Sequence, residues 1–480
     1  MSVATAPAAA TTTDPPAYRW RWVVLFAILT AEVMDLLDSL VTTIAGPTIR
    51  ADLGAPPSTV QWLAAGYTLA MAVGLVTGGR LGDLYGRRRM FLVGTVGFVA
   101  SSMLCAVAQS EGTLVTARVL QGLFGAVLLP QGFGLIKEMF PPRQVGSAFG
   151  LFGPIMGLSA VCGPILAGWL VSADLLGLSW RMIFLVNLPI GLLGLILAVR
   201  FMPESRDPAA PRLDLAGVGL ISAAMFLLVY PIVQGRELGW PAWTFASMAA
   251  ALALFAAFGW WEARRQRRGA DPLVVPTLFR KRAFTGGLVA GTAFFAGLLG
   301  FGLVLTLYLQ VGLGFSPLKT GLTGVPQAVG VIVGFGLSAA GGLARRHGRR
   351  VLQAGVTVMA VSALGFVATI HVAGAVTPWR LAPVLGLFGI GMGLAMAPFF
   401  DIILAGVEPR ESGSASGALN AAQQFAGALG VAALGTLFFN RAGGGAGVSG
   451  AIETVLCAVA GLLVLTFALT FLLPQTARAE

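Results

Sequence analysis

The chain has 480 residues, of which 56% are hydrophobic and 11% are charged, with 31 Lys and Arg against 20 Asp and Glu. A soluble domain carries about 25% charged residues, so this composition excludes an ordinary soluble protein and indicates one that lies in lipid. The net charge of +11 could suggest nucleic-acid binding, an interpretation that depends on where the cations lie. Each of the three cysteines lies in an apolar run without metal or redox spacing, so we predict packing roles and no metal site.

Residues 1–19 are rich in Ala, Thr and Pro and lack the basic and apolar segments of a signal peptide, so we predict a disordered tail. Beyond them, apolar stretches long enough to cross ~30 Å of hydrocarbon recur along the sequence. We expect membrane-spanning helices at 20–46, 58–78, 90–109, 113–136, 146–171, 182–201, 214–233, 243–261, 284–310, 318–341, 351–372, 380–404, 414–437 and 451–473. The predicted fold class is an all-α integral membrane protein with fourteen transmembrane helices, and the even number places both chain ends on one side.

Lys and Arg are distributed unequally between the two sides of this predicted topology. The two tails and the loops on their side carry 24 of the 31 cations, the opposite loops carry six, and Arg118 lies within the fourth span. By the positive-inside rule, this bias places both termini in the cytoplasm. The basic charge therefore sets topology and contacts membrane lipids, and we expect no nucleic-acid partner. The scarcity of Lys among the cations suggests a GC-rich bacterial genome and a bacterial cytoplasmic membrane.

The first span contains three carboxylates at intervals of three residues: Glu32, Asp35 and Asp38. On a helix they share one face about 120° wide, although a carboxylate near the bilayer centre costs roughly 2.5–3.5 kcal/mol on insertion scales. Such a face can be withdrawn from lipid into an aqueous cavity. Crowded carboxylates there take up protons near neutral pH and can exchange them for a cationic substrate. The alternative is that local hydrogen bonds satisfy all three carboxylates.

The loop after the second span reads GGRLGDLYGRRRM (78–90), and a similar segment recurs 262 residues later at 340–352. This repeat divides the chain into two six-helix halves that flank a two-helix insertion. We predict a cytoplasmic tail at 1–19, an N-terminal bundle at 20–201, an insertion with its linkers at 202–282, a C-terminal bundle at 283–473 and a second tail at 474–480. Parallel repeats of this kind enclose a substrate site between the halves, near the membrane midplane.

The loop at 78–90 resembles the corresponding loop of the major facilitator superfamily, through Gly79, Leu81, Asp83, Gly86, Arg87 and Arg88. Its glycines permit a tight turn, and its arginines anchor the loop against anionic headgroups. The resemblance implies that these residues, apart from the leucine, form a gate. In it, Asp83 latches against the start of the thirteenth span, near ESGSAS (411–416). Arg345 takes the place of Asp83 in the second copy, so the latch is expected on one side only.

The fourth span contains Arg118 and Gln121 in LVTARVLQGLFGA (114–126), which is similar to a pattern of the same family. A guanidinium does not release its proton, so Arg118 cannot carry a transported proton, but it can hold the charge of a neighbouring carboxylate. A purely structural ion pair is the alternative. In the fifth span, the residues that resemble the antiporter signature of the superfamily are Gly150, Gly163, Pro164 and Gly168, with Ser159 in place of a glycine. The signature implies a proton antiporter, and generic small-residue packing is the alternative.

Segments of the first span, LDSLVTTIAGP (37–47), and of the sixth, WRMIFLVNLPIG (180–191), are similar to the fourteen-helix drug:proton antiporter branch of the superfamily. Leu37, Asp38, Ala45 and Pro47 match its pattern, and Leu40 and Thr43 depart from it. The resemblance makes Asp38 the first candidate for the proton site and Asp35 the second, and Glu32 is expected to recognise cations. The substrate-binding candidates are Glu32, Asp35, Asp38, Gln121 and Asp401.

Asp401 is a fourth acid within the membrane, near the end of the twelfth span. It follows GIGMGLAMAPFF (389–400), whose glycines we interpret as packing residues, because no strand–turn–helix context for phosphate binding surrounds them. Asp401 is expected to contact substrate or contribute to coupling, and the alternative is an interfacial polar residue.

These features predict a monomeric secondary transporter that exports lipophilic, cationic drugs or antibiotics by alternating access. Protons are its coupling partner, and it needs no cofactor beyond the proton gradient. A second interpretation keeps the fold but makes the cargo a lipid or a metabolite that the cell itself produces. A third, a membrane enzyme or sensor, would require a soluble domain or a catalytic set of Ser, His or Cys. The longest cytoplasmic loop, 262–283, is too short for such a domain, and we expect no enzymatic activity.

Overall fold

The computed structural model describes residues 18–475, apart from 142–143, 145–146, 149–150, 207–212, 340–342, 373–375, 405–406, 408–411 and 446. Every regular element among the described residues is a helix, which confirms the predicted all-α fold class. The predicted tails at 1–19 and 474–480 lie largely outside the described residues.

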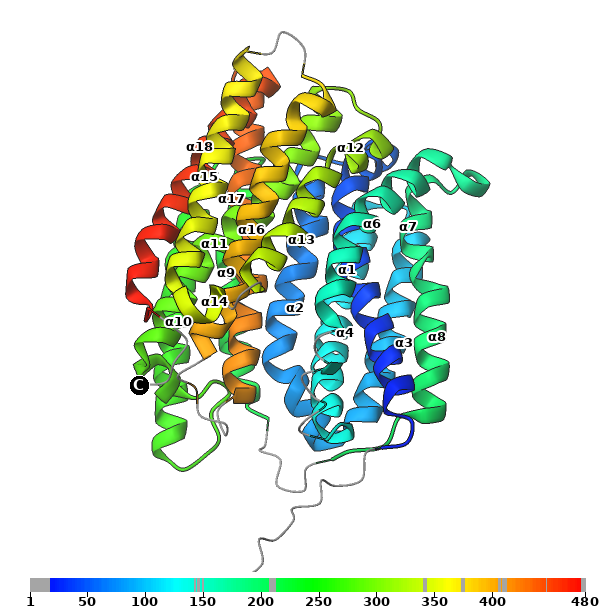
Figure 1. Ribbon diagram of the computed structural model, residues 1–480, viewed down its shortest axis with the longest axis vertical. Helices are drawn as coiled ribbons and strands as arrows, with labels where there is room; N and C mark the ends of the chain where they lie inside the picture. The colour runs from blue at the N-terminus through cyan, green and yellow to red at the C-terminus, as the bar shows by residue number, and fades with distance from the viewer. Residues whose placement is uncertain are drawn as a thin grey trace, which may run out of the picture.

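The helices cross the long dimension of the molecule, most of them antiparallel to the next in sequence (Figure 1). The first part of the chain forms α1 (Arg21–Leu53), α2 (Ser58–Tyr85), α3 (Arg87–Ala106), α4 (Glu111–Met139), α6 (Phe152–Ala173), η1 (Leu175–Gly177), η2 (Ser179–Arg181), α7 (Met182–Leu185) and α8 (Asn187–Phe201). Next come α9 (Leu215–Gln234), α10 (Ala242–Arg267) and η3 (Pro276–Arg280). The last part forms α11 (Arg282–Leu307), the π-helical turn η4 (Tyr308–Gly312), α12 (Pro317–Thr323), α13 (Val325–Ala339), α14 (Leu343–His347), α15 (Arg349–Val372), α16 (Pro378–Leu404), α17 (Ser412–Gly443), α18 (Gly447–Leu469) and η6 (Thr470–Leu472).

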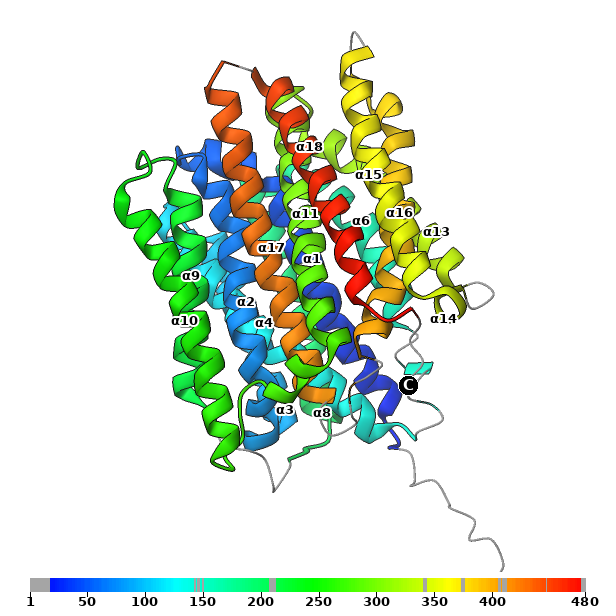
Figure 2. The ribbon, with the colours of Figure 1, turned by 90° about the vertical axis from the view of Figure 1, so that its left-hand side faces the viewer.

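Both ends of the described chain lie at the same end of the helices, which we call the terminal face (Figures 1 and 2). Tyr18, just before α1, contacts the ends of α4 and α8. Its backbone N–H donates to the Met139 carbonyl at 3.2 Å, and its hydroxyl donates to the Phe201 carbonyl at 2.9 Å. After α18, the Gln475 carbonyl accepts the backbone N–H of Arg349, at the start of α15, at 3.0 Å. The other end of the helices is called the opposite face.

Eleven of the described helices are long and apolar enough to cross a membrane, and α2 makes a twelfth if its two parts, which meet at a 48° bend, form one span. The chain is therefore a multi-pass membrane protein. The expected number of fourteen is not confirmed. The helix α1 carries three carboxylates near its middle, and the described apolar part of α6, Val161–Ala173, is shorter than a full span.

Two apolar clusters fill the space between the helices that precede residue 202. One includes Phe91 and Phe98 of α3, and the other includes Trp180 and Phe184 beside the start of α8. The helix α1 contributes Met34 to the first cluster and Leu37 and Ile44 to the second. Its acidic stretch therefore lies where the two clusters meet.

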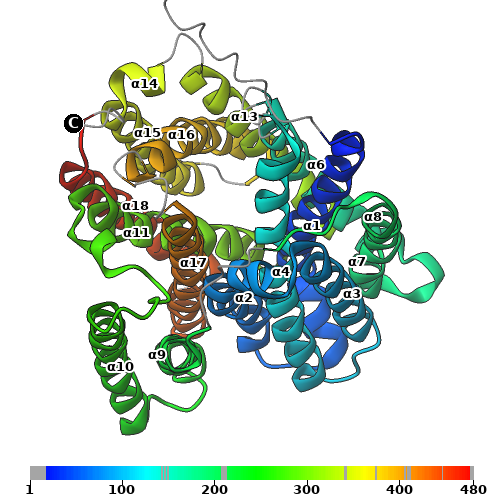
Figure 3. The same cartoon turned by 90° about the horizontal axis from the view of Figure 1, so that it is seen from below.

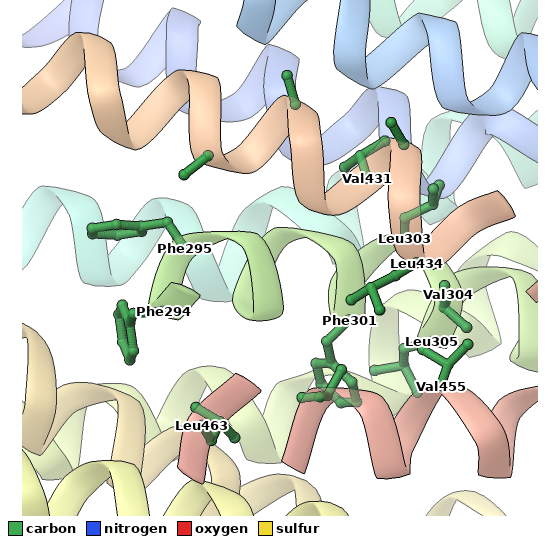
Figure 4. Packing of buried hydrophobic residues seen from close by; sticks show 14 of the residues in the cluster. Phe294, Phe295, Phe301, Leu303, Val304, Leu305, Val431, Leu434, Val455 and Leu463 are labelled. Atoms are coloured by element: carbon green, nitrogen blue, oxygen red, sulfur yellow. The ribbon is translucent and has the colours of Figure 1, made fainter. Parts of the chain in front are cut away.

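Aromatic and aliphatic side chains of α11 fill the centre of the last group of helices (Figure 4). Phe294, Phe295 and Phe301 are each at most 2% exposed. They belong to one apolar cluster with Val431 of α17 and Val455 of α18. This packing buries α11 between its neighbours, so α11 is a central helix of the second half of the chain.

Glycines of α16 allow its backbone to approach two neighbouring helices. A Cβ on Gly389 would meet the Gln327 carbonyl of α13 at 2.0 Å. A Cβ on Gly391 would meet the Gly355 carbonyl of α15 at 2.6 Å. No side chain fits in either place, and the predicted packing role of this glycine run is therefore confirmed.

The helices α9 and α10 lie side by side at the edge of the molecule, next to α17 and α2 (Figure 3). In the turn between them, the Glu237 carboxylate accepts the backbone N–H and the hydroxyl of Ser58, at the start of α2, at 3.0 and 2.8 Å. The Thr436 hydroxyl of α17 donates to the Ile232 carbonyl of α9 at 2.9 Å. The pair is therefore attached to helices from both halves of the chain.

The two halves of the chain meet along two seams. At the first, α2 packs against α17, and Gln61 donates to the Ala432 carbonyl at 2.9 Å. At the second, α1 and α6 meet α11, its extension η4, and α12. Gln310 of η4 donates to the Ile44 carbonyl at 2.7 Å, and the Leu318 N–H donates to the Ser172 hydroxyl at 3.4 Å. These contacts lie toward the opposite face, so the halves are fastened together on that side.

Candidate functional site

Asp38 is the centre of a buried polar cluster formed by α1, α4 and α8. Its carboxylate forms an ion pair with Nη1 of Arg118. Its Oδ1 also accepts hydrogen bonds from Gln121 Nε2 at 2.8 Å and Asn187 Nδ2 at 2.9 Å. All four side chains are at most 1% exposed. Both charges are thus withdrawn from solvent and lipid, and the hydrogen bonds partly replace their hydration.

Arg118 is held by two further contacts. Because Arg118 and Gln121 are three residues apart, they share one face of α4, and Arg118 Nη1 donates to Gln121 Oε1 at 2.7 Å. Its Nε donates to the Leu63 carbonyl of α2 at 3.2 Å. The orientation of the guanidinium is therefore fixed by groups from α1, α2 and α4.

Ser102 of α3 completes the cluster behind the two amides. Its hydroxyl oxygen accepts Asn187 Nδ2 at 2.9 Å and Gln121 Nε2 at 3.2 Å, and the hydroxyl donates to the Phe184 carbonyl at 3.0 Å. Four helices thus position the amides that contact Asp38. An apolar replacement of any member would leave buried polar groups of the others without partners.

Asp35 lies one turn from Asp38 and has a different kind of partner. The Tyr67 hydroxyl of α2 donates to Asp35 Oδ1. The guanidinium carbon of Arg118 lies 4.3 Å from the centre of the Tyr67 ring. Tyr67 therefore contacts both Asp35 and the cation of the buried ion pair.

Glu32 lies one further turn toward the terminal face and is partly exposed. Among the described residues, neither a hydrogen bond nor an ion pair reaches its carboxylate. Local hydrogen bonds therefore do not satisfy all three carboxylates of α1, the alternative that the sequence left open. The three acids instead pass from a fully paired Asp38, through a hydrogen-bonded Asp35, to an unpaired Glu32.

The three carboxylates of α1 differ in whether they form an ion pair, and this difference decides which of them can take up a proton. Within the described residues, Asp38 is in an ion pair, and no ion pair includes Asp35 or Glu32. A proton on Asp38 would leave the Arg118 cation buried without compensation. A proton on Asp35 or Glu32 would remove a negative charge that takes part in no described ion pair. The arrangement can thus exchange a proton at Asp35 or Glu32 while the Asp38–Arg118 pair stays intact.

Small residues of α6 contact helices of both halves of the chain. A Cβ on Gly163 would lie 3.1 Å from Leu40 Cδ1 of α1, and a Cβ on Gly168 would lie 2.5 Å from the Pro317 carbonyl at the start of α12. The other residues of the predicted antiporter motif are Pro164 inside the helix, Ser159, which is buried, and Gly150, which lies outside the described residues. The glycines of the motif thus permit close helix packing, and the role in proton antiport stays a prediction.

The turn at 78–90 is attached to the ends of α4 and α8. Gly86 has φ +103°, a conformation that favours glycine, and a Cβ there would lie 2.4 Å from Glu204 Oε1. Arg87 pairs with Asp83 at 2.9 Å and with Glu138 of α4 at 2.6 Å. The remaining predicted gate residues are Arg88, which donates to the Val199 carbonyl of α8 at 2.6 Å, and Gly79, which lies against Pro130 of α4.

The predicted latch between Asp83 and the region 411–416 is not among the described contacts. Glu411 lies outside the described residues, and Ser414 accepts the backbone N–H of Val275 at 3.3 Å. The described ion-pair partner of Asp83 is Arg87, within the first half of the chain. The latch therefore stays a prediction.

Two predicted substrate contacts lie in very different surroundings. Gln121 is fully buried, and both ends of its amide are used within the Asp38 cluster. Asp401 is exposed near the end of α16, toward the terminal face, and the hydrogen bonds of the cluster do not include it. The structure therefore brings together Asp38, Arg118 and Gln121, with Asp35 beside them, and places Asp401 elsewhere.

Sequence reasoning assigned no role to Tyr67, Ser102 or Asn187. The segment that contains Asn187 resembles known transporters, and an amide inside an apolar span is itself a signal of a buried polar contact. Tyr67 and Ser102 lie in spans with other hydroxyl side chains, and their spacing does not distinguish them. Tyr67 and Ser102 reach their partners only because their helices pack against other helices that carry the acids and amides.

Residues 22–431 match the model of the Major Facilitator Superfamily. Because the match covers most of the chain, and the chain is a helical multi-pass membrane protein, the chain belongs to the Major Facilitator Superfamily. The superfamily predicted from the motifs is thus confirmed, and the protein is a transporter and not an enzyme.

Several named bacterial proteins resemble this chain over most of its length. A "Probable actinorhodin transporter" of Streptomyces coelicolor is 49% identical over 434 residues, which cover 90% of this chain and 75% of that protein. A "Puromycin resistance protein" of Streptomyces alboniger is 37% identical over 424 residues, 87% of this chain and 82% of that protein. A "Tetracenomycin C resistance and export protein" of Streptomyces glaucescens is 34% identical over 428 residues, 88% and 77% of the two chains.

Solved structures share the fold at much lower sequence identity. A crystal structure of a POT family transporter in complex with a thioalcohol conjugated peptide has a TM-score of 0.68 and 14% identity, and the match covers 93% of this chain and 95% of that chain. At this identity the likeness establishes the fold and carries no information on substrate.

Proposed function

We propose that this chain exports small antibiotic molecules from a bacterial cell by secondary active transport. The observation that carries the proposal is the 49% identity, over 90% of the chain, to a protein named as a probable actinorhodin transporter. Relatives named for resistance to puromycin and for tetracenomycin C export support the same direction of transport. The site supports a coupled carrier, because carboxylates with different degrees of pairing lie together inside the membrane.

Proton exchange is proposed to occur at Asp35. The sequence pattern favoured Asp38, but Asp38 is paired with Arg118 and accepts two amide donors. Asp35 has a hydroxyl donor and no described ion pair. A proton can therefore bind and leave Asp35 without separating a buried ion pair.

Tyr67 is proposed to transmit the protonation state of Asp35 to its surroundings. Its hydroxyl donates to the Asp35 carboxylate when that group is ionised. When Asp35 carries the proton, the hydroxyl loses a charged acceptor, and the ring is free to shift on the Arg118 guanidinium. Arg118 in turn is bonded to α1, α2 and α4, so a local proton exchange changes contacts between helices of the first half.

The number of membrane spans and the orientation of the chain are also proposed here. We propose that α1 and α6 cross the membrane together with the twelve candidate spans, which makes fourteen, and that the terminal face lies in the cytoplasm. The halves are fastened toward the opposite face, so this conformation corresponds to one closed to the outside. A monomer with N-terminal and C-terminal bundles is the proposed working unit.

The cargo is proposed to be either a lipophilic cation or a metabolite that the cell itself produces. Glu32, which is in no described ion pair, and the exposed Asp401 favour a cation, since each is a carboxylate that can attract positive charge. The name of the 49% identical relative favours a metabolite, because it refers to one compound instead of many. Transport of a panel that contains neutral and cationic compounds of equal size separates the two.

The test uses the full-length protein in liposomes with an imposed pH gradient. Export of puromycin and proton flux are measured for the wild type, Asp35→Asn and Asp38→Asn, with the exposed Asp174→Asn as the matched control. We expect Asp35→Asn to lose gradient-driven export by more than about tenfold while it still exchanges cargo without a gradient, because alternating access does not require the charge. Asp38→Asn should lose both activities, because it leaves Arg118 without its partner. Undiminished gradient-driven export by Asp35→Asn would remove Asp35 as the carrier.

A further inference from the structure

A second buried acidic group lies at the terminal end of α9 and α10, apart from the Asp38 cluster. Asp214 is the residue before α9, Glu262 lies near the end of α10, and they are 1% and 2% exposed. Asp214 Oδ1 accepts the Gly217 N–H at 3.0 Å, and its Oδ2 accepts Trp261 Nε1 at 2.9 Å and lies 3.3 Å from Arg265 Nε. Asp214 therefore has a donor for each oxygen and a cation for its charge.

Glu262 has fewer partners. Its Oε2 accepts the Val274 N–H at 3.1 Å, whereas its Oε1 is buried without a hydrogen-bond partner among the described residues. That oxygen lies beside Asp214: a Cβ on Gly217 would be 2.7 Å from Glu262 Oε1 and 2.6 Å from Asp214 Oδ2. Two ionised carboxylates so close together and shielded from water would repel each other. A proton on Glu262 Oε1, donated to Asp214 Oδ2, removes this repulsion.

Of the charged groups that face this pair, Arg80 attracts Glu262 but forms no described ion pair with it. Arg265 of α10 is paired with Asp214 and donates to the Asp271 carbonyl at 3.1 Å. Arg80 of α2 donates to the carbonyls of residues 272 and 273, and its Nη1 has no partner in the described part of the chain. The Asp271 side chain is exposed, and Arg212 lies outside the described residues. No described ion pair includes Glu262.

The segment 271–275, which we call the strap, connects this pair to the seam between the halves. Arg80 of α2 holds its carbonyls, and the Val275 N–H donates to the Ser414 hydroxyl of α17 at 3.3 Å. Between these two attachments, Val274 is buried and its N–H bonds to Glu262. The strap thus joins α2 to α17 at the terminal face, and Glu262 holds its middle.

We propose that Glu262 and Asp214 form a proton-binding site that holds one proton between them and keeps the strap attached across the α2–α17 seam. With the proton, Glu262 Oε1 donates to Asp214 and Oε2 keeps the Val274 N–H. Loss of the proton to water leaves two negative charges beside Gly217, while Arg265 is paired with Asp214 and Arg80 is bonded to the strap carbonyls. Glu262 then moves away from Asp214 and releases the strap. The strap is attached at low pH and released at high pH, so the site responds to the pH at the terminal face.

The test measures hydrogen exchange of the strap in the full-length protein in lipid nanodiscs, from about pH 6 to about pH 9 and corrected for intrinsic exchange. In the wild type we expect exchange of the 271–275 peptide to be at least about tenfold faster at the alkaline end. In Glu262→Gln, hydrogen exchange of the strap should stay slow over the whole pH range, because the glutamine amide donates to Asp214 without a titrating proton. Asp271→Asn, an exposed acid of the same strap, should keep the wild-type pH dependence.

Two results would overturn the proposal: pH-independent exchange of the wild-type strap, or a wild-type pH dependence in Glu262→Gln. Slow exchange of α11 peptides in each variant shows that the protein is folded. The second measurement is the infrared band of a protonated carboxyl. In the wild type this band should disappear over the same pH range, and in Glu262→Gln it should be absent at every pH. An unchanged band in that variant also contradicts the site. Neither measurement depends on transport. The two experiments therefore test the proton-binding site even if the proposed export function is wrong.

Discussion

Asp38 on α1 and Arg118 on α4 are 80 residues apart in the sequence and form an ion pair in which each side chain is 1% exposed. Desolvation of two charges offsets most of their attraction, so such a pair adds little net stability compared with a well-packed apolar pair. Removal of one partner is different, because it leaves the other charge buried and uncompensated. The pair is therefore expected to act as a unit, and variants of it should be strongly non-additive.

The first prediction tests this coupling. Arg118→Met and Asp38→Leu should each lower the free energy of unfolding by about 3–5 kcal/mol, and the double variant should lose clearly less than the sum of the two. Thermal unfolding in one detergent, followed for the wild type and all three variants, measures the effect. As a control, the partly exposed pair of Arg181 and Asp52, with N···O at 2.9 Å, should give changes within about 1 kcal/mol. Additive losses at the buried pair would mean that the two charges do not depend on each other.

The second prediction concerns the hydroxyl that links Asp35 to the ion pair. Tyr67→Phe removes the donor to Asp35 but keeps the ring against Arg118. We expect gradient-driven export to fall by about tenfold, while the free energy of unfolding changes by about 1.5–3 kcal/mol, the range for a hydrogen bond to a charged group. Export from liposomes and thermal unfolding are measured on the same samples. Tyr230→Phe, on α9, is the matched control, and equal loss of export in both variants would exclude a specific role for Tyr67.

A third prediction follows from the close approach of α6 and α12. Gly168→Ala places a Cβ 2.5 Å from the Pro317 carbonyl and should push the two helices apart at the opposite face. The proximity of positions 172 and 318 is measured by cross-linking of Ser172→Cys with Leu318→Cys in a background without the native cysteines. The yield should fall several-fold with Gly168→Ala. Gly461→Ala is the control, because nothing lies within 4 Å of a Cβ at that position. An unchanged yield would show that the contact at Gly168 does not hold this side closed.

The fourth prediction tests the proposed orientation. A reporter that is active only in the cytoplasm should give signal when fused after Arg268, which follows α10 at the terminal face. The same reporter should give none after Gly445, which lies between α17 and α18 at the opposite face. The reversed pattern would place the terminal face outside the cell. Signal from both fusions would contradict the proposed number of spans between them.

Much of the fold follows from local properties of the sequence. Long apolar runs predict membrane helices, and the match to the superfamily over residues 22–431 confirms the family that the motifs indicated. The helical period alone predicts that Glu32, Asp35 and Asp38 share a face, since this depends on spacing within one helix. The glycines of α16 were likewise predicted to pack against other helices, and they do.

The partners of these residues were decided by tertiary structure. Asp38 is bonded to Gln121 and Asn187, 83 and 149 residues away, and Asp35 to Tyr67, 32 residues away. The spacing within one helix predicts which side chains share a face, but it contains no information on which face of another helix packs against them. The charge on Asp38 and the strap held by Glu262 depend on such contacts. In the middle of a helix the backbone groups are already bonded to each other, so the donors and the cation of Asp38 have to come from side chains, and here those side chains lie on other helices.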